Sequence, residues 1–498
     1  MLGMHMGRVP NPCGDKTAGG IGAFRHDTYF WLQQINRASA VANSESGLLE
    51  KPLAAEICRA LLALDAEAAE PGAERPELYI TFEPKLLERC GMRASVLHVG
   101  RSSQDILAAA NASLNIERLM QVSAAANDVV DALLTLAQRE KDAVVPAYTN
   151  GVQAQPTLYA HYLLAQAAIF SRDIDRIGEC IDRYDLCPMG SCVCNGTGWP
   201  LDSRRMAELL GFSAPAANAF DAGQGIGNDL PLELSQIVMS SMIHVNAFLA
   251  DFMAQYASPT PWIRITSTNG VYRSSAMPQK RNPGLVNDCR RDAGVVMSQA
   301  MSLPMRLQNL PLGMADARDA GLMEALADDA SVVLRTLADI VRTLEVDRKR
   351  ALAEINADWT CTQEIADRLV RLGGADFRSG HRFASAMVTW ARRTGATPLT
   401  VTYADAENLW KTFIEDKADL PQAFPLSEEA FLNALKPQGI LEARATIGSA
   451  NPKFVAASLK AAKLAAAERE ADLEARIAKR RDALERLDAQ VRRLIAEG

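Results

Sequence analysis

The chain has 498 residues, of which 48% are apolar and 23% are charged. This length predicts about three domains with a hydrophobic core large enough to be stable without disulfides or structural metals. The composition excludes a disordered, a collagen-like or a small disulfide-rich protein. The 53 Lys and Arg residues are outnumbered by 60 Asp and Glu residues, which gives a net charge of −7. The electrostatic field of a negatively charged protein repels polyanions, so we expect no binding to nucleic acid.

The opening stretch is rich in Gly and Pro and predicts an arm, residues 1–25, that orders only on neighbouring subunits. It lacks the apolar core of an export signal. The nine cysteines have no regular spacing, which predicts reduced thiols and a cytoplasmic protein. The tightest group, Cys187, Cys192 and Cys194, has no fourth ligand nearby, so we predict loop thiols and no metal site.

Helical periodicity dominates the rest of the chain. Apolar residues at helical spacing predict a small N-terminal helical domain, residues 26–107. Four long segments poor in Gly and Pro then predict a central bundle of long helices, residues 108–350. These segments are Leu114–Lys141, Pro156–Tyr184, Leu232–Tyr256 and Pro283–Leu310. A second small helical domain is predicted for residues 351–450, and strand signals such as Trp262–Thr268 are too short to build a sheet.

One uncharged run, Ala143–Ser171, is long enough to span a bilayer. It contains two prolines and several Asn and Gln residues, which predicts a buried polar segment and no membrane contact.

The tail, residues 451–498, is free of Pro after Pro452 and has apolar residues at heptad positions. These are Leu473, Ile477, Leu484, Leu487, Val491 and Leu494, and Arg480 occupies one further core position. We expect a terminal helix that packs on its own oligomer. A coiled coil that recruits a separate partner is the alternative.

The segment Arg273–Pro283 is the strongest candidate for a catalytic site, because two serine hydroxyls, a lysine and an asparagine lie close together in the sequence after Gly270. Such a segment is suited to a closing loop that places an activated Ser and a cation over an acidic substrate. An alternative is a helix start, with Asn282 as the cap and Pro283 in the first turn. Residue types alone leave both hypotheses open.

These residues match the Ser-Ser-x-Met-Pro-x-Lys-x-Asn-Pro signature of the fumarase/aspartase superfamily. The chain also resembles the argininosuccinate lyase branch at Leu97–Ser102 with Asp105, and from Tyr148 to His161. The resemblance, over residues 26–450, implies an all-α subunit of three helical domains and a homotetramer with a twenty-helix core. Each active site would be shared between three subunits.

The implied reaction is β-elimination of fumarate from a succinyl group, or its reversal, without a cofactor. By position, Ser274 matches the family's base, and Lys280 and Asn282 match the groups that stabilise the aci-carboxylate. The other positions implied to contact the small dicarboxylate substrate are Arg101, Ser102, Gln104, Thr149, Asn150, Gln155, Ser275 and Met277. Ordinary helix capping is the alternative role for Ser102 and Thr149.

The sequence departs from the family where a Thr-His pair supplies the general acid, because Thr149 is followed by Asn150. An amide donates a hydrogen bond but cannot deliver a proton. His98 and His161 are candidate replacements, although both also suit structural roles.

A second departure concerns the groups that hold an arginine side chain in argininosuccinate lyases, where this chain has Asn228, Met314 and Ala315. We therefore expect a carbon–nitrogen lyase whose substrate is an N-substituted aspartate other than argininosuccinate. The alternatives are a carbon–sulfur lyase or cycloisomerase of the same fold, or a non-catalytic relative such as the lens crystallins of this family.

Overall fold

The computed structural model describes residues 26–267, 270–312 and 320–498, so the predicted arm lies outside the described residues. The helices are α1 (Thr28–Glu45), α2 (Lys51–Ala68), α3 (Tyr79–Cys90), α4 (Ser103–Arg139), α5 (Tyr159–Tyr184), α6 (Ser203–Leu210), α7 (Ile226–Tyr256), α8 (Gly284–Leu307), α9 (Ala320–Thr343), α10 (Arg348–Ile355), α11 (Thr362–Arg371), α12 (Phe377–Thr394), α13 (Tyr403–Phe413), α14 (Glu428–Leu435), α15 (Pro437–Ala443) and α16 (Pro452–Glu497), with a 3₁₀ turn η2 (Met92–His98) and a π-helical turn η3 (Asp221–Gly225). The predicted all-α class is confirmed.

The strands are short and form two-stranded pieces only, within the described ranges. They are β1 (Val144–Thr149) with β2 (Val152–Leu158), β3 (Leu186–Cys187) with β4 (Ala214–Pro215), β5 (Ile263–Ile265) with β8 (Leu344–Val346), and β6 (Tyr272–Arg273) with β7 (Arg281–Asn282). The β3–β4 pair is parallel and the others are antiparallel.

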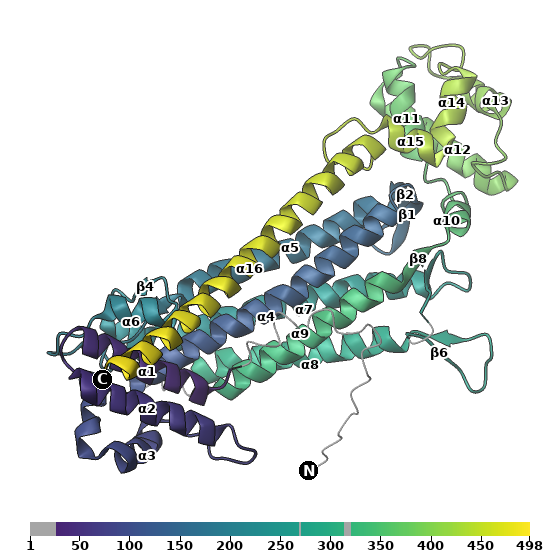
Figure 1. Cartoon of the computed structure of the whole chain (residues 1–498). Coiled ribbons are helices and arrows are strands. Elements are labelled where there is room, and N and C mark those ends of the chain that lie inside the picture. The colour runs from purple at the N-terminus through teal and green to yellow at the C-terminus, as the bar shows by residue number, and fades with distance from the viewer. Residues whose placement is uncertain (1–25, 268–269, 313–319) are drawn as a thin grey trace.

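The long helices α4, α5, α7, α8 and α9 lie side by side as a bundle (Figure 1). The four predicted long segments correspond to α4, α5, α7 and α8. Helix α4 starts earlier than expected because Ser102 and Asp105 form a capping box at its first turn. The sequence analysis missed α9, whose buried side chains Leu326, Leu334 and Val341 are separated by charged residues.

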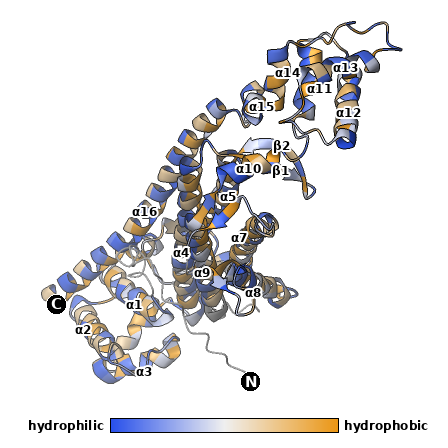
Figure 2. Ribbon diagram, turned by 90° about the vertical axis from the view of Figure 1, so that its right-hand side faces the viewer, coloured by the Kyte–Doolittle hydropathy of each residue, from blue (hydrophilic) through white to orange (hydrophobic). Residues whose placement is uncertain are grey.

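Two hydrophobic cores organise the described residues. One runs without interruption from α1 through the bundle to α10 and takes in α16. The other joins residues 359–440, where the rings of Phe383, Trp410, Phe424 and Phe431 pack together. Figure 2 shows this second group, α11–α15, at one end of the long bundle. The predicted boundaries at 107 and 350 stay predictions, since the first core includes residues on both sides of each position.

One described helix is long and apolar enough to cross a membrane by length and composition alone, Gly227–Tyr256 within α7. It packs against α5, α8 and α9, and 44% of its most apolar stretch is buried within the chain. The uncharged run Ala143–Ser171 is divided between β1, β2 and the first half of α5, so it is not a single spanning helix.

Helix α16 runs back along the whole bundle from α15 to α1 and α2 (Figure 1). Three ion pairs join it to α5 and the residue after it, Arg469–Asp175 at 2.7 Å, Arg476–Asp182 at 2.5 Å and Lys479–Asp185 at 2.6 Å. The partners are separated by 294 residues in every pair, so the two helices run parallel in one register. The tail therefore packs on its own chain, and its expected contact with other copies in an oligomer stays a prediction.

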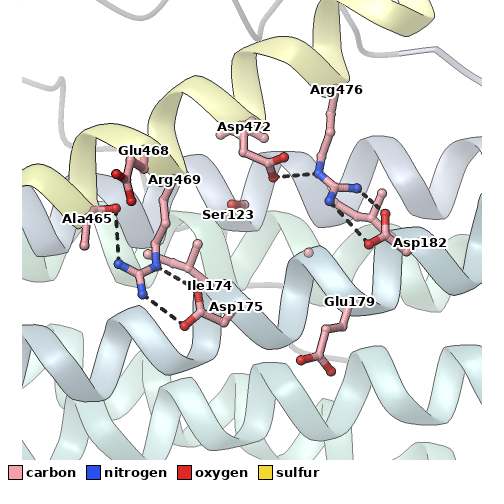
Figure 3. A pocket seen from close by; sticks show the side chains of 13 residues that line it. Ser123, Ile174, Asp175, Glu179, Asp182, Ala465, Glu468, Arg469, Asp472 and Arg476 are labelled. Atoms are coloured by element: carbon pink, nitrogen blue, oxygen red, sulfur yellow. Dashed lines mark hydrogen bonds and ion pairs between the residues drawn. The ribbon is translucent and has the colours of Figure 1, made fainter.

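Figure 3 shows the cleft of about 440 Å³ that remains between these helices. The cleft is lined by Arg469 and Arg476 of α16 and by Asp175 and Asp182 of α5. Gly178, which has no side chain to fill the space, also lines it. Each arginine is paired with a carboxylate across the cleft, so the cleft is part of the docking surface of the tail.

Arg480 lies in the apolar row of α16 and is 3% exposed. Its guanidinium lies over the rings of Trp31, at 5.1 Å, and Phe212, at 5.5 Å, and none of its nitrogens has a hydrogen-bond partner in the described parts of the chain. Burial lowers the pKa of Arg480, although the negative charges of Glu117 and Asp185 act in the opposite direction and raise it. The cation is thus desolvated without a direct ion pair.

We expect Arg480→Met to raise the melting temperature. The two ring contacts contribute about 0.5–2 kcal/mol each, whereas burying an ion costs several kcal/mol and apolar replacements of buried charges often stabilise by about 1–4 kcal/mol. Thermal unfolding followed by circular dichroism measures the change. Arg481→Met, at the exposed neighbouring position, is the matched control and should leave the melting temperature nearly unchanged. A lower melting temperature for Arg480→Met would contradict this account.

Candidate active site

The signature segment forms a hairpin in which β6 and β7 pair Tyr272 with Asn282 and Arg273 with Arg281. The Ser274 amide donates to the Lys280 carbonyl at 3.2 Å, and the Lys280 amide donates to the Met277 carbonyl at 2.9 Å. These bonds close a compact loop that carries Ser274, Ser275, Met277 and Lys280. Figure 1 shows the β6 hairpin at one end of the bundle. Three of the four are exposed and Ser274 is half-buried.

Two backbone amides of this loop converge on the Ser274 hydroxyl. Its Oγ accepts hydrogen bonds from the Met277 amide at 3.2 Å and from the Ala276 amide at 3.4 Å. Donors aimed at an oxygen stabilise it most when it is negatively charged. The loop geometry is therefore suited to lower the cost of ionising this serine.

Asn282 lies in β7, and α8 begins after Pro283, which takes the cap position without a side-chain cap bond. The alternative in which Asn282 caps the helix is therefore wrong. Pairing with Tyr272 keeps Asn282 on the same hairpin as Ser274 and Lys280.

A second segment, at the start of α4, brings Ser102 and Gln104 together. The Ser102 side chain accepts from the Gln104 amide at 3.1 Å, so this serine does cap the helix. The Gln104 side chain donates to the Gly223 carbonyl in η3 at 3.1 Å. Buried Asp105 accepts from the Ser102 amide at 2.8 Å and from the Cys192 amide at 3.2 Å. Asp105 and Gly223 thus position this segment, roles that the sequence analysis did not assign.

Arg101 precedes this segment and is 6% exposed. Its Nη1 donates to Asn36 and to Ser39, both at 3.0 Å, and its guanidinium lies 4.9 Å from the Tyr79 ring. Burial lowers the pKa of Arg101. The residue ties α1 to the start of α4, and its contact with substrate stays a prediction.

His98 stacks on Tyr79 with ring centroids 4.1 Å apart. Burial, and then the Arg101 charge, lower the pKa of His98 to about 4. A histidine with such a pKa is neutral near pH 7 and has no proton to give, so His98 is a poor candidate for the general acid.

The third segment is the turn between β1 and β2, where Thr149 pairs with Val152. Asn150 has φ +52° and Gly151 has φ +75°, which is the backbone of a tight type I′ hairpin turn and strongly favours Asn-Gly. Thr149 and Asn150 are exposed at the tip. Thr149 ends a strand, so the alternative that it caps a helix is wrong.

Residues of β2 and of the first turn of α5 tie this hairpin to the C-terminal part of the chain. The Gln155 side chain donates to Gln363 in α11. His161, the other candidate acid, contacts Thr157 Oγ1 with Nδ1 at 3.3 Å and the Gly448 carbonyl with Nε2 at 3.0 Å. Both ring nitrogens of His161 therefore have structural partners.

A single chain does not bring the three segments together. Ser102 and Thr149 lie beyond opposite ends of α4, a helix of 37 residues that is about 55 Å long. Figure 1 shows β6 at the bundle end far from α1, and the β1–β2 hairpin at that end as well. Met314 and Ala315 lie outside the described residues. Within the described residues, no cluster of three or more His, Cys, Asp or Glu side chains is arranged to hold a metal ion.

Comparison with known proteins identifies relatives that cover most of the chain. A family model described as a lyase matches residues 84–298. The argininosuccinate lyase of Acidothermus cellulolyticus is 30% identical over 449 residues, which covers 87% of each chain.

Solved structures show the same fold. A crystal structure of an EDDS lyase in complex with formate superposes with a TM-score of 0.84 at 24% identity, over 94% of this chain and 92% of that one. A crystal structure of a fumarate lyase from Mesorhizobium sp. BNC1 has a TM-score of 0.67 at 16% identity, over 87% of this chain and 95% of that one.

Proposed function

Since the chain belongs to the fumarase/aspartase superfamily and is related to the argininosuccinate lyases, we propose that it releases fumarate from an N-substituted aspartate, or adds an amine to fumarate. The observation that carries this proposal is the hairpin that places Ser274, Lys280 and Asn282 on one loop, with two amides directed at the Ser274 hydroxyl.

In the proposed mechanism, Ser274 removes the proton from the carbon beside a carboxylate. A serine alkoxide is a strong base that needs fixed donors, and the Ala276 and Met277 amides supply them. As the proton leaves, the neighbouring carboxylate becomes a dianion. Lys280 and Asn282 stabilise this charge, which builds up only along the reaction path.

We infer that Ser102, Gln104 and Thr149 bind the substrate carboxylates. The first turn of α4 directs the positive end of a long helix dipole at the position beside Ser102, which favours anions. The exposed tip of the β1–β2 hairpin offers the Thr149 hydroxyl and the Asn150 amide.

We further infer a homotetramer in which neighbouring copies complete each site. The length of α4 separates Ser102 from Thr149 within one chain. The signature hairpin is also open to water in a single chain, whereas an alkoxide base requires a dry site. Neighbouring copies would close it.

A panel of amines with fumarate tests the proposal. Fumarate absorbs in the ultraviolet, so loss of absorbance reports addition of an amine and gain reports elimination. We expect at least one primary amine to give enzyme-dependent loss. The proposal fails if the purified protein turns over no amine while a known superfamily enzyme, run as a positive control, does.

Argininosuccinate should be a poor substrate. Loss of two charged hydrogen bonds to the guanidinium, at about 1.5 kcal/mol each, reduces specificity more than a hundredfold. The positions concerned include Asn228 at the start of α7, with Met314 and Ala315. The measurement is kcat/KM for argininosuccinate beside that of the best amine adduct. Comparable values would contradict the substrate assignment.

A second candidate is a carbon–sulfur lyase, favoured by the Asn150-Gly151 turn, which has no titratable group to protonate an amine. A thiolate leaves without a proton. Adding thiols to the panel separates the two candidates.

A further inference from the structure

The turn that contains Cys192 and Cys194 is strained and half-exposed. Cys192 has φ +42° and Val193 has φ +76°, a left-handed backbone that is rare for residues other than Gly and an outlier for a β-branched side chain. Both cysteines are partly exposed, whereas the other described cysteines, Cys58, Cys90, Cys180, Cys187, Cys289 and Cys361, are buried. Within the described residues, this turn therefore holds the accessible thiols.

The spacing of the two cysteines in the chain is compatible with a bridge between them. Residues two positions apart in a chain have Cα atoms separated by at most about 7 Å, and a turn shortens this distance. A disulfide accepts Cα separations of about 4.4–6.8 Å.

The same turn contacts the groups that hold Ser102 and Gln104. The Cys192 amide donates to Asp105, whose other oxygen accepts from the Ser102 amide. The Val193 carbonyl lies against Gly223, where even a Cβ atom would be only 2.0 Å from that oxygen. Gly223 in turn accepts from the Gln104 side chain. A change in the backbone at Cys192 and Val193 is thus transmitted to both residues.

We propose that Cys192 and Cys194 form a reversible intramolecular disulfide by exchange with a low-molecular-weight disulfide such as glutathione disulfide, and that this bond loosens the Ser102–Asp105 segment. One protein thiolate attacks glutathione disulfide and expels a glutathione thiolate. The second protein thiolate then attacks the mixed disulfide and expels the other. The protein loses two hydrogens, and one glutathione disulfide becomes two glutathione molecules. The modification is independent of the proposed function, whereas its effect on substrate binding rests on it.

A closed ring would hold the two sulfurs about 2.05 Å apart with only one residue between the cysteines, and we expect this constraint to change the backbone at Val193. We expect the Cys192 amide to leave Asp105 and the Val193 carbonyl to move from Gly223. The first turn of α4 would then lose its supports, which raises KM for the substrate carboxylates.

The test uses full-length protein carrying Cys13→Ser, which removes the thiol outside the described residues. After incubation with glutathione disulfide, intact mass spectrometry should show a loss of about 2 Da that a dithiol reductant reverses. Adding Cys194→Ser should abolish this loss. In the oxidised protein, hydrogen exchange of the peptide that spans Ser102–Asp105 should speed up, and KM should rise at least fivefold.

An unchanged mass, or glutathione retained on both cysteines, would overturn the disulfide. Ring closure with unchanged hydrogen exchange would overturn the link to Ser102. Because mass and exchange require no substrate, these results are independent of whether the amine panel identifies a reaction.

Discussion

Ser274→Ala is expected to abolish release and addition of fumarate while leaving the melting temperature nearly unchanged. The hydroxyl is the proposed base, and removal of a positioned base slows reactions about 10²–10⁴-fold. The side chain bonds only to amides of its own exposed loop in the described residues, so the fold loses little with it. Initial rates with the best amine, followed by fumarate absorbance, measure the effect.

The matched control is Ser385→Ala, a change of the same size at an exposed position on α12. Its rate should equal that of the unmodified protein. Thermal melts and light scattering of both variants separate a chemical defect from a loss of folding or assembly. If Ser274→Ala keeps more than about 1% of the activity, a different group is the base.

Removal of the tail after Asn451 should lower the melting temperature strongly while leaving fumarate chemistry intact at low temperature. The tail buries six large apolar side chains against the bundle, and each contributes about 1.5–3 kcal/mol. They are Val455, Leu459, Leu473, Leu487, Val491 and Leu494. The sum is an upper estimate, so we expect the truncated chain to stay folded at low temperature, and the proposed catalytic hairpin makes no use of α16.

Point variants on α16 show whether burial is the cause. Leu487 is 0% exposed and Leu464 is 59% exposed on the same helix. Leu487→Ala should cost about 2–5 kcal/mol, and Leu464→Ala should cost little. If the truncated chain melts like the full chain and scatters light as the same oligomer, the tail does not stabilise the protein and a separate partner becomes the better explanation.

Local patterns in the sequence were sufficient for the helical class, four of the bundle helices, the tail helix and the family. Each depends on residues that are near one another in the chain: a repeat of apolar positions, a cap, or a signature. The β1–β2 hairpin had such a signal too, since Asn150-Gly151 between β-branched residues is typical of a tight turn. The same Asn150 also stands where the family has its general acid, and that substitution hides the turn signal.

Tertiary structure alone decided features that depend on distant residues. The tail packs on its own chain because carboxylates of α5 fall in register with its cations, 294 residues away. The proposed coupling of the cysteine turn to Ser102 depends on Asp105 in α4 and Gly223 in η3. The fold brings these two residues and the cysteine turn together from three separate segments. The separation of Ser102 from Thr149 follows from the straight course of α4. Periodicity records which face of a helix is buried, but it does not record what covers that face, because the partner is chosen by the packing of the whole chain.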